Sequence, residues 1–288
     1  MKTREYQKKN SMLRETMYRM CQNKLAVICM VIFVAIVLAV CGASLIAPEG
    51  YDVQNLSQAL KTPSAEHWFG TDNYGRDIFA RVLYGGRITL LVAIASTAVA
   101  TVLGLLLGCV AGYFGGRVDE VIMRVMDVFM AIPNMLLAIV IATTMGSGMV
   151  TTVLAVAVGS IPGFTRVVRA PILSVKSCEY IESARAIGAK SSRIIVHHII
   201  PNILAQVIVQ VTLGVANSII SVAGLSFLGL GVQPPTPEWG TMLSQARNYM
   251  MRNMYMLTCP GIAIVLSVIS LNVIGDALRD ALDPRLKN

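Results

Sequence analysis

Six long apolar stretches alternate with polar, charged segments along the chain. A helix needs about 20 mostly apolar residues to cross roughly 30 Å of hydrocarbon, and each stretch is about that long. The pattern therefore predicts six membrane-spanning helices. Their expected ranges are 25–47, 88–113, 121–145, 148–168, 201–230 and 256–278.

The first apolar stretch is predicted to be a retained membrane anchor. It holds 23 residues without a charge and follows a polar, basic segment of 24 residues. The apolar region of a signal peptide has only about 7–15 residues, so a cleaved leader does not fit. Two later stretches contain prolines. Pro133 falls inside the third, and the fourth is expected to end at Pro162 and Arg166.

Composition and charge support a membrane protein with both termini on the cytoplasmic side. Only 14% of the residues are charged, 55% are hydrophobic and the mean hydropathy is +0.65. Soluble domains carry about 25% charged residues, so a soluble or disordered chain is excluded. Eighteen of the 24 Lys and Arg residues lie on the side of the N-terminus and six on the other side. This bias predicts that the N-terminus and the C-terminus are cytoplasmic.

These patterns predict an all-α integral membrane protein with six segments of distinct character. They are a basic tail (1–24), an anchor helix (25–47), an external connector (48–87), a five-helix core (88–278), a cytoplasmic loop within that core (169–200) and a second cytoplasmic tail (279–288).

Groups that carry catalysis or bind metals are scarce, so we predict no enzyme, no catalytic residue and no metal site. His197 and His198 are adjacent, and neighbours on a helix point about 100° apart, which makes them a poor metal clamp. Asp127 is the one carboxylate well inside a predicted helix, and an ion pair with Arg124 is favoured over a proton relay. No phosphate-binding loop is present, so we expect no cofactor on this chain and any ATP-driven motor on another.

The largest cytoplasmic loop is predicted to hold two short helices outside the membrane. Small residues recur at helical spacing in the first, and Gly188 is expected to end it. The second would begin near Ser191 and end before Pro201. One interpretation is a helix on which a partner docks. The other is an amphipathic connector on the membrane surface, although its polar face is sparsely basic.

At this loop the sequence resembles the permease subunits of bacterial ABC importers. Their E-A-A-x3-G-x9-I-x-L-P pattern is matched by Glu182, Ser183, Ala184, Gly188, His198, Ile200 and Pro201, with Ser, His and Ile in place of Ala, Ile and Leu. The segments 69–87, 224–240 and 275–288 extend the likeness over nearly the whole chain. The resemblance is specific to the second, C-type permease subunit of dipeptide, oligopeptide or nickel importers.

The resemblance implies a type I importer fold and a permease for short peptides in the bacterial inner membrane. A nickel or metal-chelate importer of the same family is the alternative. The implied partners are a second homologous permease, two ABC ATPase subunits that hold ATP and Mg, and an external solute-binding protein. The residues that would couple to the ATPase are Glu182, Ser183, Ala184, Arg185, Ala186, Gly188 and Pro201.

Two rows of small or polar residues lie along predicted spans at helical spacing. The row on the fifth span consists of Gln206, Gln210, Gly214, Asn217, Ser221 and Gly224. It would either line a translocation path or join helices through small residues and amides. The row on the second span has no amide, and helix packing is favoured there. It consists of Thr97, Thr101, Gly104, Gly108 and Gly112.

The connector is predicted to contain a short helix from Tyr74 to Tyr84. The pairs Asp72/Arg76 and Asp77/Arg81 have i,i+4 spacing and would support it, either as a solvated face or as a partner contact. Outside the transport class, a stand-alone channel or a membrane sensor is the competing hypothesis. A sensor would need a soluble output domain, and a channel would not need the docking loop.

Overall fold

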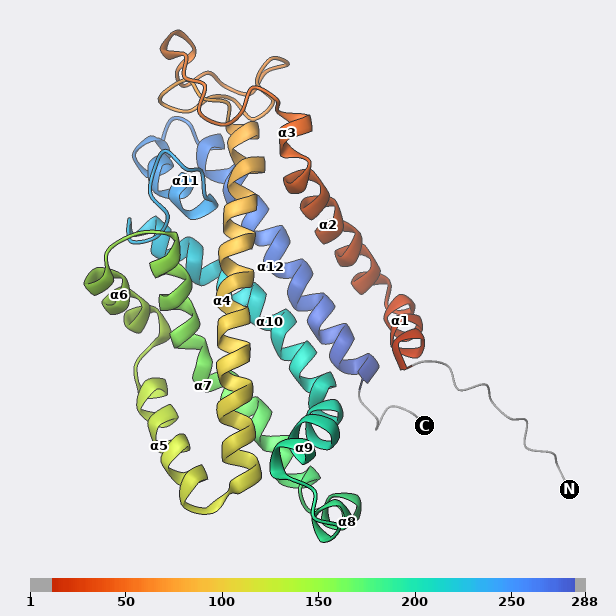
Figure 1. Cartoon of the computed structure of the whole chain (residues 1–288). Helices are drawn as coiled ribbons and strands as arrows, with labels where there is room; N and C mark the ends of the chain where they lie inside the picture. Colours follow the sequence, from red (N-terminus) through yellow and green to blue (C-terminus); the bar gives the residue numbers. More distant parts are fainter. Residues whose placement is uncertain (1–11, 283–288) are drawn as a thin grey trace, which may run out of the picture.

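A computed structural model describes residues 12–282, and nearly all of their regular structure is helical (Figure 1). The predicted tails 1–24 and 279–288 therefore lie partly outside the described residues. In chain order the α-helices are α1 (Met12–Gln22), α2 (Lys24–Cys41), α3 (Ala43–Ile46), α4 (Ile78–Phe114), α5 (Gly116–Ala131), α6 (Asn134–Met145), α7 (Met149–Val175), α8 (Glu179–Ala186), α9 (Ser191–Ile194), α10 (Ile200–Phe227), α11 (Trp239–Ala246) and α12 (Tyr255–Leu282).

The long helices form one bundle with two distinct ends. α4 packs against α7, and α10 contacts α4, α7 and α12. One end, here called the loop end, carries α8 and α9 (Figure 1). The other, here called the connector end, carries α11 and residues 47–77 (Figure 1). The bundle places α10 where it touches three other long helices.

Among the described residues, five helices are long and apolar enough to span a membrane: α2, α4, α7, the α9–α10 helix and α12. A sixth span is possible only if α5 and α6 are counted together, and they meet at an angle of 87°. The break follows from Pro133, which disfavours helical geometry at the preceding residue, and Ile132 is extended. The prediction of one helix over 121–145 was wrong in this respect.

Other predicted helix limits also shift. α7 continues past Pro162 and Arg166 to Val175, so the first residues of the predicted loop 169–200 are helical. α4 begins at Ile78, where the Asp77 carboxylate caps it by accepting from the Ala80 N–H. The predicted connector 48–87 therefore includes the start of α4, and the predicted helix 74–84 is not a separate element.

The glycine row on α4 is closed by α7. A Cβ added at Gly108 would lie 2.7 Å from Val168 Cγ1, and one at Gly112 would lie 2.9 Å from Ile172 Cβ. Gly104 sits equally close against Phe164. Glycine lets two backbones approach in this way, so the packing interpretation of this row is confirmed.

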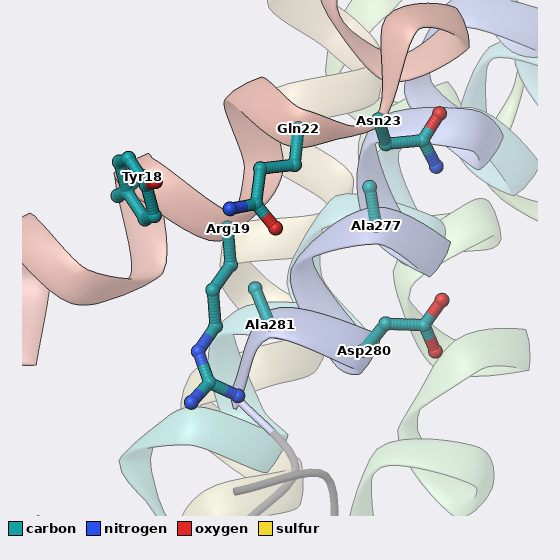
Figure 2. Close-up of a pocket in the computed structure, with 7 residues that line it drawn as sticks. All are labelled: Tyr18, Arg19, Gln22, Asn23, Ala277, Asp280 and Ala281. Atoms are coloured by element: carbon teal, nitrogen blue, oxygen red, sulfur yellow. The ribbon is translucent and has the colours of Figure 1, made fainter.

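The anchor helix α2 lies on the outside of the bundle against α12 (Figure 1). Only 17% of its span is buried, and its exposed side chains are apolar, as expected for a helix that faces lipid. α1 also contacts α12, and a hollow of about 660 Å³ opens between them. Figure 2 shows Arg19 and Asp280 on either side of Ala281 in this hollow. This hollow lies where the N-terminal helices meet the core.

The charges at the connector end form a buried network. Arg76 and Arg81 are 3% and 1% exposed, and both lie beside the carboxylate of Asp72. Arg81 thus pairs with Asp72 and not with Asp77, which contacts His67 Nδ1 at 2.8 Å. The solvated-face interpretation is wrong, because both arginines are buried, and spacing alone does not reveal this burial.

Candidate coupling loop and translocation path

α8 has one packed face and one open face. Ile181 and Ala184 are buried in a cluster with Ile194, Ile199 and Ile203 from α9, the following turn and α10. The open face and the end of α8 expose Glu182, Ser183, Arg185, Ala186, Ile187 and Gly188. Most of the predicted coupling residues thus lie on an accessible surface, whereas Ala184 belongs to the face that holds the helix in place.

The end of α8 is set by Gly188, as predicted. Gly188 has a φ of +79°, and the N–H of Ala189 donates to the carbonyl of Ala184 in the manner of a Schellman motif. No atom lies within 4 Å of the position of a Cβ at Gly188. A side chain there would strain the backbone without a steric clash.

Side-chain contacts attach α8 and its flanks to two other helices. The Arg185 guanidinium lies 5.0 Å from the centroid of the Tyr113 ring at the end of α4. The Asn202 amide on α10 donates to the Tyr180 hydroxyl at 2.9 Å. Partial burial raises the pKa of Tyr180 above its ordinary value, so the phenol stays neutral near pH 7. These contacts link α8 and its flanks to α4 and α10.

The second loop helix does not end before Pro201, so that prediction was wrong. A π-helical turn, Ile195–Ile199, joins α9 to α10, and helix continues from Ser191 to Phe227. The Ile200 N–H donates to the carbonyl of Ile195, five residues back. A proline ring clashes with the carbonyl four residues before it, and the wider turn is a known way to accommodate such a disturbance. The loop is therefore continuous with a membrane span.

The polar row on α10 faces a hollow between α6, α7 and α10. The hollow has a volume of about 420 Å³, and Gln210, Gly214, Asn217 and Ser221 line it. Gln206 is exposed outside it, and a Cβ at Gly224 would lie 2.9 Å from Met135 Cε. Four of the six predicted path residues thus share one cavity, and the two end residues do not.

The amides of this row have no hydrogen-bond partner among the residues that the structure describes. Within residues 12–282, the side chains of Gln206, Gln210 and Asn217 make no hydrogen bond to the chain, and Ser221 donates only to the carbonyl of Asn217 on its own helix. Amides that joined helices of this chain would be bonded across them. Their lack of partners favours side chains that face water in the cavity. The assignment of this row to the translocation path stays a prediction.

Sequence reasoning missed several residues of the site. Asn134 and Ser160 line the hollow from α6 and α7, and Ile187 is 86% exposed at the tip of α8. Asn134 could have been suspected, because it directly follows Pro133. The predicted partner of Asp127 was also wrong. The Asp127 carboxylate accepts from Arg166 on α7 at 2.8 Å, and not from Arg124 on its own helix.

No metal centre is assembled in the part of the chain that the structure describes. No group of three or more His, Cys, Asp and Glu side chains there could hold an ion. His197 is exposed and His198 half-buried in the π-helical turn. The site is therefore built from an exposed face of α8, a continuous helix and an uncharged polar hollow.

Two family models match the chain in separate parts. Residues 104–288 match the model described as "binding-protein-dependent transport system inner membrane component". Residues 11–63 match "N-terminal TM domain of oligopeptide transport permease C". The second match covers the anchor helix and part of the connector, and the first begins within α4.

Curated relatives are 40–47% identical to the chain over the aligned residues. The dipeptide transport system permease protein DppC of Alkalihalophilus pseudofirmus is 44% identical over 96% of this chain and 90% of that protein. The di/tripeptide permease DppC of Pseudomonas aeruginosa is 40% identical over 96% and 94%. The glutathione permease GsiD of Pectobacterium atrosepticum is 47% identical over 83% and 80%.

Among solved structures, the chain is similar to a subunit of the MetNI methionine ABC transporter in an inward-facing conformation. The TM-score is 0.58 at 19% sequence identity, over 70% of this chain and 97% of that one. At this identity the likeness establishes the fold alone, which is that of a type I importer permease.

Proposed function

The chain belongs to the binding-protein-dependent transport inner membrane component family of ABC importer permeases, and from this membership we propose that it imports short peptides. It is a multi-pass transport subunit. In the proposal it forms one half of a pathway across the bacterial inner membrane and passes ATP-driven motion to its cargo. ATP and Mg belong to separate ATPase subunits.

One observation carries the coupling step. α8 packs on Ile194, Ile199 and Ile203, and the helix that holds these residues continues without interruption to Phe227. An ATPase that moves α8 would therefore move the same helix that carries Gln210 and Asn217. A rigid helix transmits a displacement, and alternating access arises when such elements rock as bodies.

The open surface of α8 supports a docking role. Glu182 and Ser183 are exposed on it, and Ile187 adds an apolar side chain at its tip. Isolated exposed apolar residues are common, but Ile187 lies within the segment that resembles the ATPase-binding pattern. We propose that the ATPase covers Glu182, Ser183, Ala186, Ile187 and Gly188, and that Ala184, Arg185 and Pro201 hold the loop in shape.

A peptide cargo agrees with the lining of the hollow. Its polar groups are amides and hydroxyls from Asn134, Ser160, Gln210, Asn217 and Ser221. Such groups exchange hydrogen bonds with peptide amides of any sequence. A nickel importer would suit a lining with imidazole, thiolate or carboxylate groups, and the hollow has none among its lining residues. We therefore favour peptides over nickel or a metal chelate.

The proposed assembly contains a second homologous permease, two ATPases and an external solute-binding protein. The loop end would face the cytoplasm, in line with the excess of Lys and Arg on that side. The connector end would face the binding protein. α5 and α6 leave many apolar side chains exposed, as expected if a second permease completes the path there.

The test of this function is peptide uptake by the assembled complex in liposomes. Glu182→Lys should lower ATP-driven uptake by more than about tenfold, because it reverses a charge at the docking surface. Glu179→Lys makes the same change three residues earlier on α8, outside the resembling pattern, and should leave uptake within about twofold. Normal uptake by the Glu182 variant would remove the coupling assignment.

A further inference from the structure

Two ion pairs join α5 to α7, and they differ in how firmly they are closed. Asp119 and Arg169 make two contacts of 2.5 Å, so both carboxylate oxygens are used, and their side chains are 16% and 27% exposed. Asp127 and Arg166 make one contact of 2.8 Å, and their side chains are 51% and 50% exposed. The first pair uses both carboxylate oxygens, whereas the second leaves an oxygen and N–H groups exposed on the surface of this chain.

The open pair lies one helical turn from the hollow, toward the loop end. Asp127 precedes Met130 by three residues, and Arg166 follows Gly163 by three, so each shares a helix face with a residue that lines the hollow. The lining itself has no charged side chain. Neither α6 nor α10 contains an Asp, Glu, Lys or Arg. Asp127 and Arg166 are therefore the first charged groups beyond the hollow on its surrounding helices.

We propose that Asp127 and Arg166 contact the cargo where it leaves the path, and that they recognise the two charged ends of a short peptide. Arg166 would donate to the carboxylate of the peptide in place of Asp127, and Asp127 would accept from the ammonium of the peptide in place of Arg166. The inference rests on the proposed function and assigns these two residues as a contact site for a zwitterion.

Replacing the Asp127–Arg166 ion pair by contacts with the peptide costs little free energy. A free dipeptide carries one positive and one negative end at neutral pH, and moving both past an uncharged wall forfeits hydration. At the open pair, one charge-assisted hydrogen bond between protein groups is replaced by two between protein and cargo. Half-exposed side chains lose little further solvation when they change partners, and an exposed ion pair contributes little to stability. The closed pair Asp119–Arg169 has no free carboxylate oxygen for such an exchange.

The test compares free and capped peptides in the assembled complex in liposomes. The binding protein is preloaded with a dipeptide or with the same dipeptide amidated at its C-terminus, and initial uptake is measured at saturating binding protein. Arg166→Gln should slow the free dipeptide by about tenfold, the loss expected for one charge-assisted hydrogen bond, and should leave the rate of the amide within about twofold. Asp127→Asn should act in the same way on free peptides relative to N-acetylated ones.

Arg169→Gln is the matched control, because it makes the same change three residues further along α7. It should lower the melting temperature and change both uptake rates by one common factor. If Arg166→Gln does not assemble, the double variant Asp127→Asn/Arg166→Gln leaves no unpaired charge and should also reduce the free dipeptide to the rate of the amide.

An equal effect of Arg166→Gln on both peptides, or no effect on either, would overturn the inference while peptide transport itself stood. Failure of the wild-type complex to accumulate any peptide would instead contradict the proposed function.

Discussion

Two rows of small and polar residues, one on α4 and one on α10, have the same helical spacing but opposite surroundings. On α4, Gly108 lies against the side chain of Val168 and the backbone of Thr165, and α7 covers the three glycines of the row. On α10, Gln210, Asn217 and Ser221 line a hollow of about 420 Å³. The glycines of the α4 row pack against a neighbouring helix, whereas the α10 row lines a cavity.

The difference lies in what the side chains require. Glycine has no side chain, so two backbones can approach closely. It also has no side-chain polar group that needs a hydrogen-bond partner. A primary amide brings two N–H groups and an oxygen that must be satisfied, and Asn217 finds no protein partner among the described residues. Polar content at the same spacing therefore separates a packing face from a wet face.

The largest expected effect is on the α4 row. Gly108→Leu should prevent recovery of folded protein, because its Cβ would lie 2.7 Å from Val168 Cγ1 and 2.8 Å from the backbone oxygen of Thr165. Neither atom can move without separating α4 from α7, and overpacking of this kind costs about 1–3 kcal/mol or more. The measurement is the yield of monodisperse protein in detergent and its melting temperature.

Gly163→Leu is the control for that experiment. No atom lies within 4 Å of a Cβ at Gly163, which faces the hollow on α7. This variant should fold and melt near the wild-type temperature. Equal loss of both variants would mean that the hollow is closed by packing, and the contrast between the two rows would fail.

A smaller effect is expected on the α10 row. Asn217→Leu should leave the melting temperature nearly unchanged, because the amide holds no helix of this chain. It should lower peptide uptake by about tenfold, since one polar contact to the cargo or its water is lost. Ile220→Leu conserves volume in the same wall and should keep uptake within about twofold. A large fall in stability with Asn217→Leu would favour the role of interhelical glue.

The sequence predicts the parts of the fold that depend on local pattern. The spacing of Gln210 and Asn217 identified one wall of the hollow, and Gly188 correctly marked the end of α8. The resemblance in the loop predicted the family. These features are set by residues within a few turns of each other, so periodicity and motif spacing suffice.

The missed features depend on contacts between distant segments. Pro133 produces an 87° break, whereas Pro162 stays within α7, because neighbouring helices decide how a proline is accommodated. The spacing of Asp72 and Arg76 indicated a pair but not its burial. Likewise, Arg166 became the partner of Asp127 only when α7 packed beside α5.

The central claim is that motion of α8 reaches the polar wall of α10, and nucleotide-dependent thiol labelling tests it most directly. Asn217→Cys is made in a variant without the six native cysteines, and the assembled complex is labelled with a water-soluble thiol reagent, nucleotide-free and with ATP trapped. We predict that the labelling rates differ between the two states and become equal when Glu182→Lys is added. No labelling in either state, or a difference that survives Glu182→Lys, would contradict the account.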